Sequence, residues 1–86
     1  MNVHVGSILH SYTGGRDVVT AKGRTLADVF VDLDRSFPGI RFRIVDEQDR
    51  LRPHIAVFVG NAPTRNLGST LDAAADIHVL GALSGG

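Results

Sequence analysis

The sequence contains no cysteine, and this absence excludes several kinds of chemistry. Without thiols the chain has no disulfide framework, no thiolate zinc site and no cysteine nucleophile. It also lacks an excess of charge of one sign, because nine basic residues balance nine acidic ones. Nucleic-acid-binding proteins normally carry a basic excess or stripe. We therefore expect no nucleic-acid partner.

Long apolar runs are missing too. No segment approaches the ~20 apolar residues that cross a bilayer, and the opening MNVHVGSILH lacks the basic start of a signal peptide. We expect no membrane association and a cytoplasmic location. The 86 residues suit one domain, and an apolar fraction of 43% with 21% charged residues suits a folded globular chain.

Motifs of catalysis and nucleotide binding are absent as well. The chain has no G-x-S-x-G nucleophile elbow, no Walker-type phosphate loop and no G-x-G-x-x-G. His4, His54 and His78 could share one face of a sheet, but no carboxylate or cysteine is placed to complete a metal site with them. We expect neither a catalytic residue, nor a bound metal, nor a bound cofactor.

The apolar pattern of the first half predicts a hairpin and a helix. Residues 1–22 are typical of a β-hairpin, because alternating valines, a Gly-Gly turn and a β-branched segment follow one another. Thr25 with Asp28 resembles a capping box that begins a helix, and a Pro-Gly pair ends it. Its apolar stripe consists of Leu26, Val29, Phe30, Leu33 and Phe37.

The second half predicts two more strands. Residues 39–50 fit either a short strand or a helical turn, and end in an acidic, solvent-exposed turn. Strands are expected at residues 54–59 and 77–80. One amphipathic helix on one sheet gives an α+β domain of β-grasp order over residues 1–81. Residues 82–86 are expected to form a flexible tail.

The final pair, Gly85 and Gly86, indicates chemistry at the chain end. A C-terminal carboxylate is ionised at neutral pH and can attack the α-phosphate of ATP to form an acyl-adenylate. Gly86 has no Cβ to shield its carbonyl carbon, and Gly85 adds freedom to enter a narrow channel. A terminal Gly-Gly pair alone is also compatible with simple coil.

The pattern as a whole resembles the ubiquitin-like sulfur carriers of the MoaD/ThiS family, and most of all its CysO-type and MoaD-like members. The resemblance runs end to end, through HSYTGG, TLADVFVDL, LRPHIAVFV and IHVLGALSGG. Its specific part is the last strand with the tail. Gly81 departs from the family, in which proline is common at this position.

The resemblance implies a carrier and protein co-substrate rather than an enzyme. An E1-like activating enzyme of the MoeB/ThiF type would use ATP to adenylate Gly86, and a sulfur donor would convert it to a thiocarboxylate. A sulfur-accepting synthase would then take the sulfur, in cysteine, molybdopterin, thiazole or specialised-metabolite synthesis. The free carrier is expected to be a monomer. The residues implied to thread the partners' active sites are Ala82, Leu83, Ser84 and Gly85.

Strand alternation predicts where partners dock. If alternate residues of segment 54–59 face the helix, His54 and Phe58 face outward, and the same argument turns His78 and Leu80 outward. The two strands are neighbours in a β-grasp sheet, so Phe58 and Leu80 are expected side by side. Exposed apolar side chains beside the tail suit a partner-binding surface.

Two other classes of function fit the same pattern. A ubiquitin-like modifier would be joined through Gly86 to lysines of target proteins. A non-covalent interaction module would work without the two terminal glycines. A change of mass to a thiocarboxylate, isopeptide adducts on other proteins, and activity of a chain lacking both glycines distinguish the three.

Overall fold

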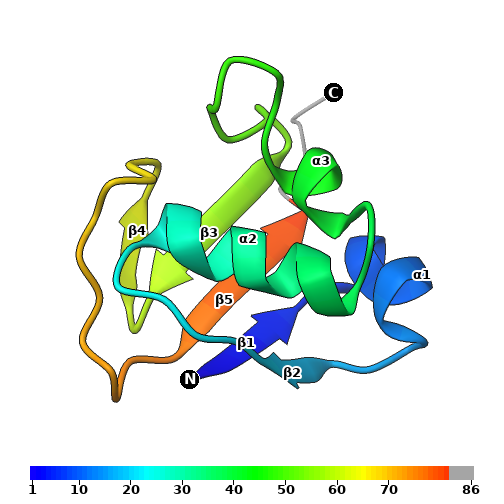
Figure 1. The fold of residues 1–86 in the computed structure, drawn as a ribbon, viewed down its shortest axis with the longest axis horizontal. Helices are drawn as coiled ribbons and strands as arrows, with labels where there is room; N and C mark the ends of the chain where they lie inside the picture. The colour runs from blue at the N-terminus through cyan, green and yellow to red at the C-terminus, as the bar shows by residue number, and fades with distance from the viewer. Residues whose placement is uncertain (82–86) are drawn as a thin grey trace.

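The computed structural model describes residues 1–81, which form one five-stranded mixed sheet crossed on one face by a helix (Figure 1). The strand order is β2-β1-β5-β3-β4; β1 and β5 run parallel, and the other neighbours are antiparallel. This is the predicted α+β, β-grasp arrangement. The strands are β1 (Asn2–Val5), β2 (Val18–Thr20), β3 (Ile55–Val59), β4 (Ala62–Thr64) and β5 (Ile77–Gly81). The helices are η1 (Ser7–Leu9), α1 (His10–Thr13), α2 (Leu26–Ser36) and α3 (Ile40–Ile44).

The predicted N-terminal hairpin exists, but its first strand ends well before the Gly-Gly turn. β1 ends at Val5, and the chain turns at Gly6, whose N–H donates to the carbonyl of Val79. The following residues form η1 and α1 instead of continuing the strand. Leu9 is thereby fully buried in the core, while Ile8 is only partly buried and packs against it. Two adjacent apolar residues that both contact the core fit a helical turn better than a strand.

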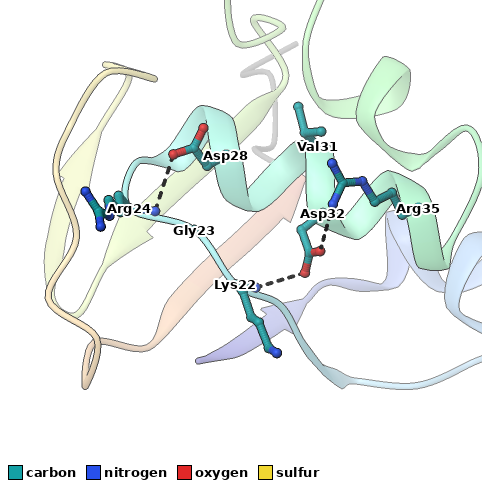
Figure 2. Close-up of a pocket in the computed structure, with 7 residues that line it drawn as sticks. All are labelled: Lys22, Gly23, Arg24, Asp28, Val31, Asp32 and Arg35. Carbon is teal, nitrogen blue, oxygen red and sulfur yellow. Dashed lines mark hydrogen bonds and ion pairs between the residues drawn. The ribbon is translucent and has the colours of Figure 1, made fainter.

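Helix α2 begins where predicted and is capped at its N-terminus. The Oγ1 atom of Thr25 accepts a hydrogen bond from the N–H of Asp28 at 3.2 Å. The Asp28 carboxylate accepts from the N–H of Arg24, one residue before the position that a capping box would use. Asp32 accepts from the N–H of Lys22 at 2.9 Å (Figure 2). These bonds hold the loop before α2 against the first two turns of the helix.

The predicted apolar stripe of α2 forms the centre of the core. Leu26, Val29, Phe30 and Leu33 are fully buried against the sheet, and Phe37 is partly buried at the end of the helix. The sheet contributes the inward side chains of its three central strands. These are Val3, Val5, Ile55, Val57, Ile77 and Val79.

The ambiguous segment after α2 forms a short helix, α3. Asp34 holds its start, because its Oδ1 atom accepts from the N–H groups of Gly39 and Arg41, both at 3.1 Å. Ile40 and Ile44 are fully buried, whereas Phe42, between them in sequence, is 59% exposed. In a helix, residues four apart share a face, and the residue midway between them points away.

The acidic segment after α3 is the predicted solvent-exposed turn. A bridge between Val45 and Leu51 closes it. Asp46 organises it from within, since its Oδ1 atom accepts from the N–H groups of Gln48 and Arg50 at 2.9 and 3.0 Å. An aspartate that bonds to N–H groups further along the chain in this way is typical of a local turn.

Strand β4 is absent from the sequence prediction, which has only a polar connection after residue 59. It pairs with β3 after a turn at Gly60 and Asn61, and Gly60 has the positive φ of 60° that such a turn requires. Pro63 lies within β4, and a proline normally argues against a strand. Because β4 is an edge strand, the missing N–H costs no ladder hydrogen bond inside the sheet.

None of the helices within residues 1–81 is long and apolar enough to cross a membrane.

Leu33 tests the predicted stripe. Replacing it with alanine removes a fully buried side chain, so Leu33→Ala should lower the free energy of unfolding by about 2–5 kcal/mol in chemical denaturation. The matched control is Val31→Ala, which changes a residue of the same helix that is 41% exposed and should alter stability by no more than about 0.5 kcal/mol. Equal effects of the two substitutions would contradict the assignment of the buried face.

Asp46 gives a pH-dependent test of the turn. The hydrogen bond from the Arg50 N–H lowers the pKa of the Asp46 carboxyl below its ordinary value of 3.8. A lowered pKa means that the carboxylate's contribution to stability is present above the unfolded-state pKa. That contribution is lost as the pH falls through the folded-state pKa. An NMR titration should place the Asp46 midpoint lower in the folded chain than in the urea-unfolded chain. Identical midpoints would show that the turn does not hold this carboxylate.

Candidate functional site

The terminal residues on which the sequence prediction relies lie outside the described part of the chain. These are Ala82, Leu83, Ser84, Gly85 and Gly86. The structure does describe the strand that leads to them, because Gly81 is the last residue of β5. β5 lies in the middle of the sheet, between β1 and β3. The C-terminal segment therefore follows directly on a central strand whose two neighbours are both hydrogen-bonded to it.

The side chains of β5 point alternately to the two faces of the sheet. Ile77 and Val79 are fully buried and face α2, whereas Leu80 is 41% exposed on the opposite, open face of the sheet. His78 lies on the same open face and is half-buried. The alternation predicted for this strand is therefore confirmed.

The strands β3 and β5 bring Phe58, His78 and Leu80 to one hollow on the open face. They line it together with Gly60 and Asn61. We call this set of five residues the open-face hollow. Phe58 and Leu80 were expected side by side, but they are not directly opposite each other. The register pairs Phe58 with His78 and Leu80 with Ala56. Phe58 and Leu80 are thus diagonal neighbours, and His78 lies directly opposite Phe58.

A second histidine extends this surface. The parallel register of β1 and β5 places His4 beside His78, and their rings stack with centroids 4.4 Å apart and planes 11° from parallel. The Nε2 atom of His4 lies 3.2 Å from a carboxylate oxygen of Asp76. The two rings are nearly parallel. The His78 ring therefore lines the open-face hollow on the side of β1, with the His4 ring stacked against it.

His54 lies apart from the other predicted docking residues. It precedes β3, which begins at Ile55, so strand alternation does not determine its position. It lines a different hollow together with Tyr12, Phe42, Arg43 and Arg52. Sequence reasoning missed this grouping, because its members come from α1, α3 and the segment before β3. The signal present in the sequence was the Arg-Phe-Arg run of residues 41–43 between two buried isoleucines.

A third hollow lies along α2, and among its charged groups Arg35 pairs with Asp32 at 3.9 Å. Lys22 and Arg24 point away from one another (Figure 2). The carboxylates of Asp28 and Asp32 are already occupied by backbone N–H groups. Within residues 1–81 no three side chains of histidine, aspartate or glutamate are grouped so as to hold a metal ion.

Comparison with known proteins places the chain among small carrier proteins, although no protein family model matches it. It is 32% identical over 91 residues to the sulfur carrier protein CysO of Mycobacterium tuberculosis, which covers 100% of this chain and 98% of that protein. The crystal structure of that CysO superimposes with a TM-score of 0.89 at 26% identity, over 95% of this chain and 98% of the other.

Two further solved structures share the fold. The Amycolatopsis orientalis BexX/CysO complex contains a chain that superimposes with a TM-score of 0.89 at 30% identity, covering 99% of this chain and 98% of the other. The small archaeal modifier protein 1 of Methanosarcina acetivorans gives a TM-score of 0.81 at 21% identity, over 99% and 94% of the two chains. At this identity the archaeal protein is informative about the fold alone.

Proposed function

Because this chain belongs to the CysO family of sulfur carrier proteins, we propose that its reactive group is the C-terminal carboxylate of Gly86. Sulfur carriers are not themselves catalysts. In the proposed cycle an E1-like enzyme of the MoeB/ThiF type adenylates this carboxylate with ATP, a sulfur donor makes the thiocarboxylate, and an acceptor enzyme takes the sulfur. The observation that carries the proposal is the Gly85-Gly86 terminus that follows the central strand β5 in a CysO-like fold.

The proposed chemistry proceeds in two steps at one carbon atom. A carboxylate oxygen of Gly86 attacks the α-phosphorus of ATP, and pyrophosphate leaves to give the acyl-adenylate. A sulfide sulfur then attacks the carbonyl carbon, the bond to AMP breaks, and a thiocarboxylate remains. Glycine suits both steps because it has no Cβ near the reacting carbon. ATP is held by the activating enzyme, since this chain has no phosphate-binding loop.

The open-face hollow is the proposed contact with the partner enzymes. Phe58 and Leu80 offer apolar surface, and His78, which is paired with Phe58, offers a polar edge. Leu80 directly precedes the last described residue, so a partner that receives Gly86 approaches this face. Burial of an apolar side chain of this size stabilises a complex by about 1.5–3 kcal/mol. The A. orientalis CysO likewise occurs in a complex, with BexX.

The first test is a mass measurement. Incubation with an E1-like enzyme, ATP and sulfide should replace one oxygen by sulfur, an increase of about 16 Da in the intact mass that follows from the two atomic masses. A chain that lacks Gly86 should show no such change. Isopeptide adducts on other proteins without thiocarboxylate would instead support the modifier, and an unchanged mass would support the non-covalent module.

The second test concerns the open-face hollow. Phe58→Ala and Leu80→Ala should each lower kcat/KM for thiocarboxylate formation about tenfold or more, because each removes apolar contact with the partner. Leu80→Ala should leave the free energy of unfolding nearly unchanged, since Leu80 is 41% exposed. Val31→Ala, on α2 and away from this face, is the matched control. A loss of stability that accounts for the whole loss of rate would place these side chains in the core rather than at an interface.

A further inference from the structure

A second surface lies at the end of the sheet where β5 ends. It consists of Tyr12, Phe42, Arg43, Arg52 and His54, which line one hollow. We call it the basic-aromatic surface. Figure 1 shows that α1, α3 and the start of β3 gather at this end of the sheet, around the tip of β5. The surface is separate from the open-face hollow, which shares none of its residues.

Arg52 and Phe42 are held together in a defined geometry. The guanidinium carbon of Arg52 lies 4.6 Å from the centroid of the Phe42 ring. The Nε atom of Arg52 also donates a hydrogen bond of 2.7 Å to the backbone carbonyl of Phe42. Phe42 is nevertheless 59% exposed. The pair therefore presents an oriented cation and an aromatic ring to solvent, at a low entropic cost for binding.

Arg65 fixes the backbone beneath this surface. Its guanidinium donates hydrogen bonds to the carbonyl oxygens of Ile55 and Leu51, both at 2.8 Å, and of Arg52 at 3.0 Å. The N–H of Ile55 also donates to the carbonyl of Arg52 at 2.9 Å. The short segment that carries Arg52 and His54 is thus tied together before any partner binds.

The charge of the surface is not balanced within the described chain. In residues 1–81, the arginines with a carboxylate within 4.0 Å are Arg35 and Arg41. Arg43 and Arg52 have none, although Arg52 is close enough to Asp46 to favour its ionised form. Two guanidinium groups without a carboxylate within 4.0 Å, beside a histidine and an exposed ring, are complementary to carboxylates flanked by apolar side chains.

The position of the surface limits which partner can reach it. Ile55 pairs with Gly81 in the β3–β5 ladder, and Arg52 and His54 lie within three residues of Ile55. The five residues after Gly81 span at most about 18 Å even when fully extended. An enzyme that acts on Gly86 must therefore come within this distance of Gly81, which lies at the end of the sheet that carries the basic-aromatic surface.

We propose that the basic-aromatic surface binds an acidic rim on the enzyme that adenylates Gly86, with Arg43 and Arg52 facing its carboxylates and Phe42 packing on an apolar side chain. This inference rests on the proposed function. The surface supplies electrostatic steering and orientation at one side of the C-terminal segment, while the open-face hollow supplies apolar contact. Charge pairs at the edge of an interface act mainly on the association rate and are screened by salt.

The test compares two variants with the same change in net charge. Arg43→Gln removes a cation that makes no hydrogen bond through its side chain within residues 1–81, and Arg24→Gln removes one at the start of α2. We measure kcat/KM for thiocarboxylate formation by intact mass at low and high NaCl. Arg43→Gln should be about three- to tenfold slower than wild type at low salt, and Arg43→Gln/Arg52→Gln slower still. The difference should shrink at high salt, and Arg24→Gln should match wild type throughout.

Each outcome decides between the two proposals. If wild type forms no thiocarboxylate, the proposed function fails and this inference fails with it. If wild type is converted but Arg43→Gln and the double variant match Arg24→Gln at low salt, the surface alone is wrong. A loss of rate that is equal at low and high salt also overturns the electrostatic role. Phe42→Ala gives an independent check, because its effect on kcat/KM should persist at high salt while the free energy of unfolding changes little.

Discussion

The pairing of β5 between β1 and β3 is the constraint on which the rest of the structure depends. The last strand of the chain fills the middle of the sheet, so the sheet is complete only when the first and last strands have met in parallel. Two parallel strands also require a crossover connection between them. Helix α2 lies in the connection from β1 to β5 and covers one face of the sheet. The C-terminal segment thus follows a strand that is hydrogen-bonded to a neighbour on both edges.

The period of two along this strand separates the side chains of the core from those of the open face. Ile77 and Val79 complete the core beneath α2, while His78 and Leu80 lie on the open face. Substitutions at alternate positions of one short strand therefore change either the core or the exposed surface. The same division applies to β3, where Ile55 and Val57 are buried and Phe58 lines the open-face hollow.

Elements set by local patterns could be predicted from the sequence, and those set by distant partners could not. Helix α2 has both a capping threonine and a five-residue apolar stripe, so its bounds were recoverable. β4 was missed because its stability comes from pairing with β3, and Pro63 conceals it. Alternation placed Phe58 and Leu80 on one face, but it could not predict the register, which pairs Phe58 with His78 and Leu80 with Ala56. The basic-aromatic surface joins residues 12 and 54, and no local pattern links them.

The parallel register of β1 and β5 also separates the two ends of the described chain. Val3 pairs with Ile77 and Val5 with Val79, so Met1 lies near the start of β5 and Gly81 at its opposite end (Figure 1). The terminal nitrogen of Met1 donates to the carbonyl of Ala21, a bond that an amide N–H could replace. A fusion partner joined at Met1 would therefore keep this bond and lie at the end of the sheet opposite Gly81. An affinity tag, a reporter or a whole enzyme attached there would leave the end of the sheet at Gly81 accessible. The fold is therefore a convenient module for gene fusion.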